Sequence, residues 1–238
     1  MWTPTALASE ARRKQGTAWR VVEDQHTAST RKLVDTRRDQ EILEDILEAT
    51  KPPVPRDADA LHYLLQTPFR YNAPYPVGSR FRRAGSTDGV FYASEQVRTA
   101  LAEMCHYRMR FFSDSPAAVL PRQQHRLSVF SVDYRARRAI DLTKAPFAQH
   151  RATWIHPTDY QTTQAFADTA RQANIELIRY ESARDRDGGI NVAMLTPSAL
   201  RSKEPRETQT WFLYLSPREA NCERTTTEGR KERWTFAG

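Results

Sequence analysis

The chain has 238 residues, a formal net charge of +7 and a mean hydropathy of -0.72, and 10% of its residues are aromatic. This length suffices for one sizeable core, and the aromatic content argues against a disordered chain. No apolar run approaches the roughly 18 residues needed to cross a bilayer, and Met1 to Lys14 lacks the apolar stretch of a signal peptide. We therefore expect a folded protein that has no membrane partner and stays in the cytoplasm.

The first quarter of the chain carries one short apolar segment and one helical pattern. Ala18 to Val22 predicts a strand, the residues before it look frayed, and from Ser29 the pattern becomes helical. An apolar stripe on this helix, which we expect to pack in the core, consists of Ile42, Leu43, Ile46 and Leu47. Prolines at 52, 53 and 55 end the helix, because proline lacks the amide donor. The sequence therefore predicts an N-terminal helical extension, residues 1–59, packed on a domain of residues 60–238, as one globular unit overall.

Positive charge is concentrated in a turn-rich stretch from Pro68 to Gly89. Its four arginines, with no acid between the first and the last, are Arg70, Arg80, Arg82 and Arg83. Such a loop attracts anions in general, including nucleic acid, phosphates, dinucleotides and acidic partners. The structural alternative is a solvated basic face.

A buried strand that leads directly into a helix follows this loop. Gly89 to Ala93 predicts the strand, and we expect Ser94 to cap the helix, with Glu95 complementing the positive end of its dipole. The apolar face of the helix, at 3.6-residue spacing, consists of Val97, Ala100, Leu101, Met104 and Phe111. Glu103 falls at the margin of that face. Its carboxylate is therefore expected to point into a cleft.

The second half of the chain alternates strands with one amphipathic helix. Strands are expected at 127–134, 139–142, 175–180, 190–195, 211–215 and 233–236, and a helix at 160–173 with Phe166, Ala167 and Ala170 inward. The Gly188-Gly189 turn predicts that 175–180 and 190–195 form a hairpin. Many short strands with few helices predict an α+β fold with a mixed, mostly antiparallel sheet and flanking helices.

Common nucleotide and metal motifs are absent from the sequence. There is no Gly-x-Gly-x-x-Gly and no ATPase-type phosphate-binding loop. Asp185-x-Asp187-Gly188 lacks the later glutamate of a calcium loop, and the six histidines have no zinc spacing, so no metal site is expected. Cys105 and Cys222 lie far apart in the sequence, and we expect reduced thiols.

Four motifs, in order, resemble the RES domain, a family named for an arginine, a glutamate and a serine. They are Gly78-Ser79-Arg80-Phe81, Gly89-Val90-Phe91-Tyr92-Ala93-Ser94-Glu95, Ala100-Leu101-Ala102-Glu103 and Arg179-Tyr180-Glu181-Ser182-Ala183-Arg184. The resemblance covers roughly residues 60 to 200. The family commonly has Gly-Gly-Arg-Trp and a small polar residue where this chain has Gly-Ser-Arg-Phe followed by Arg82. This departure concerns the arginine loop more than the identity of residues 60–238 as a RES catalytic domain.

The resemblance implies a fold like that of the ADP-ribosyltransferase toxins and an enzyme that breaks the nicotinamide glycosidic bond of NAD+. Cleavage would proceed by phosphorolysis or hydrolysis, with inorganic phosphate as a possible co-substrate and no cofactor beyond NAD+ as substrate. The implied partner is an antitoxin of the Xre-like helix-turn-helix type that covers the active site.

The implied site residues have side chains that suit this chemistry. Arg80 would clamp a phosphate, with Arg70 or Arg82 adding positive field, and Tyr92 would stack on nicotinamide and orient it through its phenol. Glu103 would stabilise developing positive charge on the ribose, and Ser182 would hydrogen-bond ribose or nicotinamide. We expect Arg80, Glu103 and Ser182 to be catalytic, and Arg80 and Glu103 to belong to a cleft and not to the apolar core.

Two other functions are compatible with the sequence. A protein-modifying ADP-ribosyltransferase would share the NAD+ pocket and differ only in its acceptor. A nucleic-acid-binding module would explain the net charge of +7, but basic residues are scattered among acids and no helix-turn-helix, RNP or zinc-finger pattern is present. We therefore expect no direct binding of nucleic acid.

Overall fold

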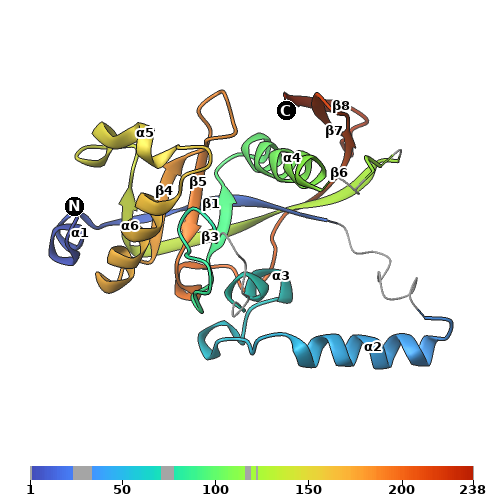
Figure 1. Cartoon of the computed structure of the whole chain (residues 1–238), viewed down its shortest axis with the longest axis horizontal. Helices are drawn as coiled ribbons and strands as arrows, with labels where there is room; N and C mark the ends of the chain where they lie inside the picture. Colours follow the sequence, from blue (N-terminus) through green and yellow to red (C-terminus); the bar gives the residue numbers. More distant parts are fainter. Residues whose placement is uncertain (1, 24–33, 71–77, 116–118, 122, 238) are drawn as a thin grey trace.

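The computed structural model describes residues 2–23, 34–70, 78–115, 119–121 and 123–237, and it is built around one curved sheet (Figure 1). The strands are β1 (Arg12–Glu23), β2 (Phe91–Ser94), β3 (His125–Asp141), β4 (Leu177–Glu181), β5 (Ile190–Met194), β6 (Thr208–Leu215), β7 (Glu219–Thr225) and β8 (Lys231–Ala237). Their order is β1-β2-β5-β4-β3-β6-β7-β8, and only β3 and β4 pair in parallel. The predicted α+β fold with a mixed, mostly antiparallel sheet is confirmed.

Helices flank this sheet. The α-helices are α1 (Pro4–Glu10), α2 (Arg37–Thr50), α3 (Tyr63–Gln66), α4 (Val97–Asp114), α5 (Arg151–Trp154) and α6 (Gln161–Gln172). Short 3-10 helices are η2 (Arg56–Ala58), η3 (Thr67–Phe69), η4 (Phe147–His150) and η5 (Pro197–Ala199). None of the helices in the described part of the chain is both long and apolar enough to span a bilayer.

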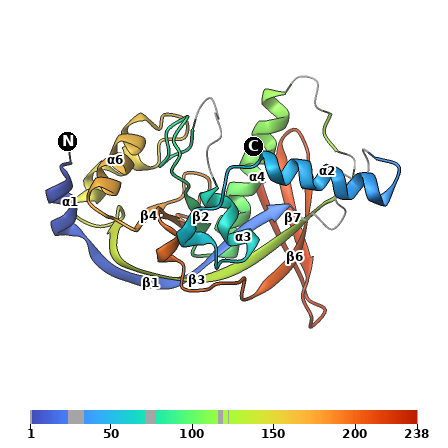
Figure 2. The ribbon, with the colours of Figure 1, turned by 90° about the horizontal axis from the view of Figure 1, so that it is seen from below.

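The strands β1 and β3 close part of the sheet on itself. They pair over the whole of β1, and β1 also meets β2 where Trp19 lies opposite Ser94. The other edge of β3 is shared, because β6 pairs near its start and β4 pairs near its end. Strands β1, β2, β5, β4 and β3 therefore form a closed cycle. Figure 2 shows β1 and β3 as two long curved ribbons that run side by side, with α6 and α4 on the same side of them.

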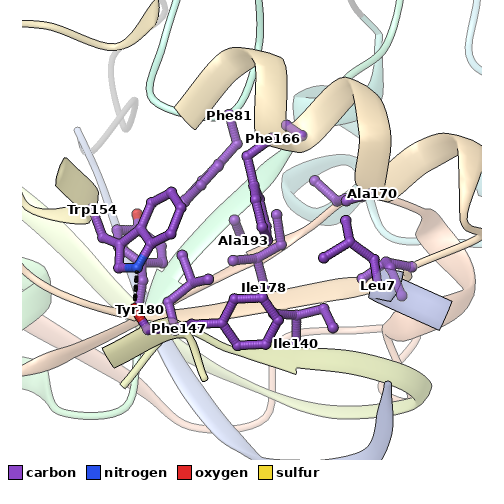
Figure 3. Close-up of a cluster of buried hydrophobic side chains, with 14 of the residues drawn as sticks. Leu7, Phe81, Ile140, Phe147, Trp154, Phe166, Ala170, Ile178, Tyr180 and Ala193 are labelled. Carbon is purple, nitrogen blue, oxygen red and sulfur yellow. Dashed lines mark hydrogen bonds between the residues drawn. The ribbon is translucent and has the colours of Figure 1, made fainter. Parts of the chain in front are cut away.

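The strand alternation sends buried side chains to opposite faces of β2, β5 and β4. Phe91 and Val192 pack in one apolar cluster, whereas Ala193, Ile178 and Tyr180 pack in another. Figure 3 shows this second cluster, in which Phe81, Trp154 and Phe166 join Tyr180. As predicted, α6 turns Phe166, Ala167 and Ala170 inward. The site described below lies on this face.

The predicted start of α4 is wrong by two residues. The helix begins at Val97, its N-cap is Gln96 without a side-chain hydrogen bond, and its first turn holds no acid. Ser94 and Glu95 are instead the end of β2 and the residue after it, and both side chains bond to the sheet, Ser94 to Asn191 and Glu95 to Arg179. A tertiary partner has outcompeted the local cap.

The apolar residues of α4 are only partly buried. Ala100 and Leu101 are buried, as expected, but the Phe111 side chain is 46% exposed. On the buried side, Cys105 lies with its Sγ 3.3 Å from Sγ of Cys222 on β7, although 117 residues separate them. Both cysteines are free, and both are fully buried.

Two expectations for the N-terminal region are wrong. The residues before Ala18 were expected to be frayed, but residues 4–10 form α1, which is capped by the hydroxyl of Thr3 and anchored by the fully buried Leu7. The strand expected from Ala18 starts earlier, because β1 begins at Arg12 within the main sheet. The stripe on α2 does not pack in the core: no residue of α2 is buried, and Ile46 is 54% exposed. Figure 1 shows α2 projecting away from the sheet. An amphipathic pattern specifies a helix face but not what covers it. The boundary at residue 60 stays a prediction.

The C-terminal half follows the predicted order with two differences. The segments expected at 127–134 and 139–142 are one strand, β3, because pairing with β1 continues through the arginine-rich stretch between them. Strand β7 was not expected, since its exposed positions carry charged residues. The predicted hairpin of β4 and β5 is present in antiparallel register.

Candidate functional site

Three neighbouring strands place polar side chains on one face of the sheet. Ser94 on β2, Asn191 on β5 and Tyr180 on β4 lie directly opposite one another in register. Directly paired residues, and residues two apart on one strand, share a face. Tyr92 and Ser182 therefore lie on this face too. Asn191, Ser182 and Ser94 are each at most 3% exposed, so their polar groups need partners within the protein.

Glu103 of α4 is the acceptor on which these polar groups converge. Its Oε1 accepts one hydrogen bond from Ser182 Oγ at 2.6 Å and another from Asn191 Nδ2 at 2.6 Å. No described residue donates to its Oε2. One carboxylate oxygen is thus held by the protein, while the other keeps its hydrogen-bonding capacity.

The turn after β4 explains why Ser182 faces α4. The hydroxyl of Ser182 accepts from the backbone amides of Arg184 and Asp185, both at 3.0 Å. Asp185 in turn accepts from Thr99 Oγ1 at 2.7 Å and forms an ion pair with Arg98. Arg98 and Thr99 lie in the first turn of α4. The loop after β4 is therefore attached to this helix about one helical turn before Glu103. The Ser182 hydroxyl is fully occupied, with one donated and two accepted bonds.

The arginine loop forms a tight hairpin turn around Arg80. Ser79 and Arg82 exchange backbone hydrogen bonds of 2.8 and 3.2 Å. Gly78 has φ of 62° and no room for a Cβ against the Arg82 carbonyl, so glycine is required there. From α6, Gln164 Nε2 donates to the carbonyls of Ser79 and Arg82. The turn is thereby fixed over the sheet.

Arg80 is more enclosed than a cleft residue was expected to be. It is 8% exposed, and its Nη1 donates to the Trp154 carbonyl at 2.6 Å. Its guanidinium lies 4.8 Å from the ring centroid of Tyr160 and 6.0 Å from that of Tyr180. Aromatic faces stabilise a cation at these distances. Arg80 therefore helps to hold the core together, and any role at a cleft uses its remaining N–H groups.

Two tyrosines of this face have opposite hydrogen-bonding states. The Tyr92 phenol oxygen lies 2.9 Å from Ser79 Oγ and accepts from the Phe81 amide at 2.9 Å, so it anchors the arginine turn. Burial raises the pKa of Tyr92. The Tyr180 residue is 5% exposed, yet its hydroxyl bonds to no described residue.

Tyr180 lies where the charges of the site meet. Burial raises its pKa well above the ordinary value, and the negative charge of Glu103 acts in the same direction, whereas Arg80 opposes it. Tyr92 and Tyr160 also act on this phenol. The hydroxyl stays protonated at neutral pH and is a donor that has no acceptor among the described residues.

The structure brings Arg80, Tyr92, Glu103 and Ser182 together on one face, and other arginines lie at or beyond its edge. Arg82 acts electrostatically on Tyr92, but Arg83 forms an ion pair with Asp168 on α6 at 2.6 Å. Arg70 binds α2, because its Nη1 donates to Glu48 at 2.6 Å, and it has no contact with Glu103, Tyr92 or Ser182 among the hydrogen bonds and ion pairs of the described residues. The rest of the stretch between them, residues 71–77, lies outside the described residues. The roles expected for these residues stay predictions.

Sequence reasoning missed Asn191 and Tyr180 as members of the site. Tyr180 on β4 lies two positions before Ser182, which directly follows that strand, so strand alternation was a usable signal for it. Asn191 is the second residue of β5, close behind the Gly188-Gly189 turn, where a polar residue is ordinarily part of the turn. Only the pairing of β5 between β2 and β4 brings it to Glu103.

Comparisons with known proteins agree with this architecture. A chain in the crystal structure of the M. tuberculosis MbcT–MbcA toxin–antitoxin complex is similar, with a TM-score of 0.51 and 12% sequence identity over 89% of this chain and 92% of that chain. At this identity the likeness concerns the fold. No curated protein matches the chain. The family model for the RES domain matches residues 53–216, which include every residue of the site. Since this match spans more than half of the chain, the protein belongs to the RES domain family.

Proposed function

We propose that this protein is a toxin-type enzyme that cleaves the nicotinamide glycosidic bond of NAD+, by phosphorolysis or hydrolysis. The observation that carries the proposal is the state of Glu103, whose Oε1 is held by two donors while no described residue donates to Oε2. A carboxylate oriented in this way is suited to a reaction in which positive charge develops on the ligand.

Cleavage of the C1'–nitrogen bond passes through an oxocarbenium-like state, as in glycoside hydrolysis. The free oxygen of Glu103 would accept a ribose hydroxyl and face the developing charge. Electrostatic stabilisation of this kind contributes several kcal/mol when the charged group is already oriented. The electrons of the broken bond leave with neutral nicotinamide, and water or phosphate supplies the new oxygen on C1'.

The remaining groups have matching tasks. Trp154 accepts one N–H of Arg80, and no other described residue accepts from it, so the guanidinium retains donors for a pyrophosphate oxygen. The free hydroxyl of Tyr180 would donate to the ligand between Arg80 and Glu103. Because the phenol of Tyr92 is bound to the arginine turn, its proposed contact with nicotinamide uses the ring face. Ser182, with its hydroxyl saturated, would act by orienting Glu103.

A second anion would have to approach from the arginine turn if the reaction is a phosphorolysis. Besides Arg80, whose charge acts on Tyr180, Arg82 is the arginine of this turn whose charge acts on Tyr92 of the site. Arg83 is instead paired with Asp168 of α6, and its charge is not among the causes of the pKa shift of either tyrosine. We therefore assign Arg82 before Arg83 to a phosphate co-substrate.

An Xre-type antitoxin that covers this face is the proposed partner. The support is the fold shared with a chain of a toxin–antitoxin complex, together with the positive charge of the arginine turn. An acidic or C-terminal carboxylate of the antitoxin would pair with the arginines that hold pyrophosphate. Competition between NAD+ and antitoxin is the expected consequence.

The test is incubation of purified protein with NAD+, in buffers with and without phosphate, followed by identification of products by mass spectrometry. Phosphorolysis gives nicotinamide and ADP-ribose phosphorylated at C1', with a rate that rises and saturates with phosphate. Hydrolysis gives free ADP-ribose in both buffers. Glu103→Gln, which retains the shape of the side chain, is the matched inactive control.

Two outcomes would overturn the proposal. Intact NAD+ after prolonged incubation with folded protein excludes cleavage of NAD+. Labelled ADP-ribose on a cellular protein, without phosphate dependence of NAD+ loss, identifies the chain as an ADP-ribosyltransferase.

A further inference from the structure

Asn191 is a nearly fully buried amide in the middle of the site. It is 3% exposed, and it lies on β5 between Ser94 of β2 and Tyr180 of β4. A buried amide in a strand is costly unless both its donor and its acceptor are used. Here the NH2 group and the carbonyl oxygen each have one partner, and each bond leads to a different element of the fold.

The two bonds of Asn191 define its orientation. Its Nδ2 donates to Glu103 Oε1 at 2.6 Å, and its Oδ1 accepts from Ser94 Oγ at 2.6 Å. An ionised carboxylate only accepts hydrogen bonds, so the NH2 group must face Glu103 and the carbonyl must face Ser94. Ser94 is 2% exposed and thus holds the amide in this orientation without competition from bulk water.

Asn191 and Ser182 donate to the same oxygen of Glu103 from two neighbouring segments of the fold. Ser182 belongs to the turn fastened to the start of α4, whereas Asn191 belongs to the sheet. Two short bonds to one oxygen leave the carboxylate little freedom to rotate. Oε2 is then presented in one direction, away from both donors.

We propose that Asn191 is a positioning residue for Glu103 and that Ser94 acts only through Asn191. The three residues form a relay, Ser94 to Asn191 to Glu103, that aims Oε2 at the ligand. This inference rests on the proposed function, because it takes Glu103 as the catalytic carboxylate. Neither Ser94 nor Asn191 touches the ligand in this assignment.

The kinetic test is a double-mutant cycle of Ser94→Ala and Asn191→Ala, measured as kcat and KM for NAD+. A misaligned carboxylate lowers the rate of the chemical step, so Asn191→Ala should lower kcat about 10- to 100-fold, with KM changed less than about threefold. Ser94→Ala should have a smaller effect in the same direction. The double variant should be no slower than Asn191→Ala alone, because Ser94 then has nothing to orient.

Gln209 offers a matched control on β6. It is 9% exposed, donates to Glu207 and accepts from Trp211 Nε1, so it bridges a carboxylate and a second side chain as Asn191 does, but away from Glu103. Gln209→Ala should lower the melting temperature without lowering kcat. Equal losses of kcat in Gln209→Ala and Asn191→Ala, or additive losses in the double-mutant cycle, would overturn the relay.

A spectroscopic measurement separates failure of the relay from failure of the proposed function. In 15N-labelled protein without NAD+, the side-chain NH2 resonances of Asn191 should shift in Glu103→Gln and in Ser94→Ala, and stay in place in Gln209→Ala. If NAD+ is not cleaved but these shifts occur, the proposed function fails and the relay stands. If the Asn191 side-chain resonances do not shift in Glu103→Gln, the relay is wrong, regardless of whether the protein cleaves NAD+.

Discussion

At the scale of single residues, Tyr92 and Tyr180 differ in the hydrogen bonds of their hydroxyl groups. We expect the hydroxyl of Tyr92 to serve the structure and that of Tyr180 to be available to a ligand. Both are surrounded by protein, and burial raises the pKa of both. The Tyr92 oxygen has two partners in the arginine turn, whereas the Tyr180 oxygen has none among the described residues. Removal of each hydroxyl should therefore have a different consequence.

Tyr180→Phe should leave the free energy of unfolding within about 0.5 kcal/mol of the parent, because no internal hydrogen bond is lost. NAD+ cleavage should fall by roughly tenfold through loss of one donor to the ligand. Tyr92→Phe is the matched control and should destabilise the protein by about 1–2 kcal/mol, since two bonds to the turn are lost. Denaturant unfolding and turnover of both variants provide the measurement. Full activity in Tyr180→Phe would remove this residue from the site.

Substitutions of Arg80 and of Glu103 should both abolish turnover, but they should differ in their effect on the free energy of unfolding. Glu103→Gln keeps an acceptor for Ser182 and Asn191, so we expect loss of turnover with a stability change below about 1 kcal/mol. Arg80→Ala should abolish turnover and also cost about 2–3 kcal/mol, because it removes a buried hydrogen bond and the cation between two tyrosine rings. Thermal unfolding with activity assays tests both, and near-normal turnover in either variant contradicts its assignment.

At the scale of elements, the site depends on how the turn from Ser182 to Gly189 docks on α4. A Cβ at Gly189 would overlap Thr99 Oγ1 and the Asp185 carboxylate, the groups that fasten this turn. A Cβ at neighbouring Gly188 would meet nothing, although its φ of 74° is strained for other residues. Substitution of Gly189 therefore tests the close packing of the turn on α4, whereas substitution of Gly188 tests backbone strain alone.

Gly189→Ala should push the turn from α4, move Ser182 away from Glu103 and lower both stability, by about 2–3 kcal/mol, and turnover. Gly188→Ala should cost only about 1 kcal/mol, with turnover retained. Denaturant midpoints and kcat of the two variants are the measurement. Equal effects on turnover would show that the fit of the turn against α4 does not position Ser182.

At the scale of the whole molecule, His106 ties stability to pH. It lies on α4, and burial, with Arg184 and Arg110 nearby, lowers its pKa from 6.5 to about 4. Between these values the unfolded chain binds a proton that the folded protein does not, so stability falls as pH decreases from 6.5 to 4. Above 6.5 this residue has no effect. A second loss of stability is expected at lower pH, where Glu95 becomes protonated. Burial raises the pKa of this carboxyl, but its hydrogen bonds and charge interaction with Arg179 lower it, and the net pKa is below the ordinary value.

Protonation of His106 should lower the free energy of unfolding by about 1 kcal/mol, once solvent screening of this half-buried group is taken into account. The melting temperature should therefore decrease by roughly 2–4 °C between pH 6.5 and 4.5. His106→Gln should flatten this window and leave the loss at lower pH in place. Scanning calorimetry of both proteins across the range measures it. A slope that persists unchanged in His106→Gln would assign the pH dependence to other groups.

The fold class could be predicted because it depends on local patterns. Alternation predicted β4, β5 and β6, and helical spacing with Phe166, Ala167 and Ala170 predicted α6. The extent of β1 and β3 could not be predicted, because their ends are polar and only mutual pairing makes them strands. Nor could the exposure of Ile46, since periodicity does not say whether another element covers a helix face.

For the site, the sequence by itself determined the residue types and their order: an arginine in a tight turn, a tyrosine before a helix, a glutamate on that helix and a serine after a strand. Only the tertiary structure decided their states. The Ser182 hydroxyl hydrogen-bonds to Glu103 and to two backbone amides. Arg80 lies near two aromatic rings. Asn191 belongs to the site because β5 lies between β2 and β4. Hydrogen bonds and burial depend on neighbours distant in the chain, and a linear pattern contains no information on which neighbours those are.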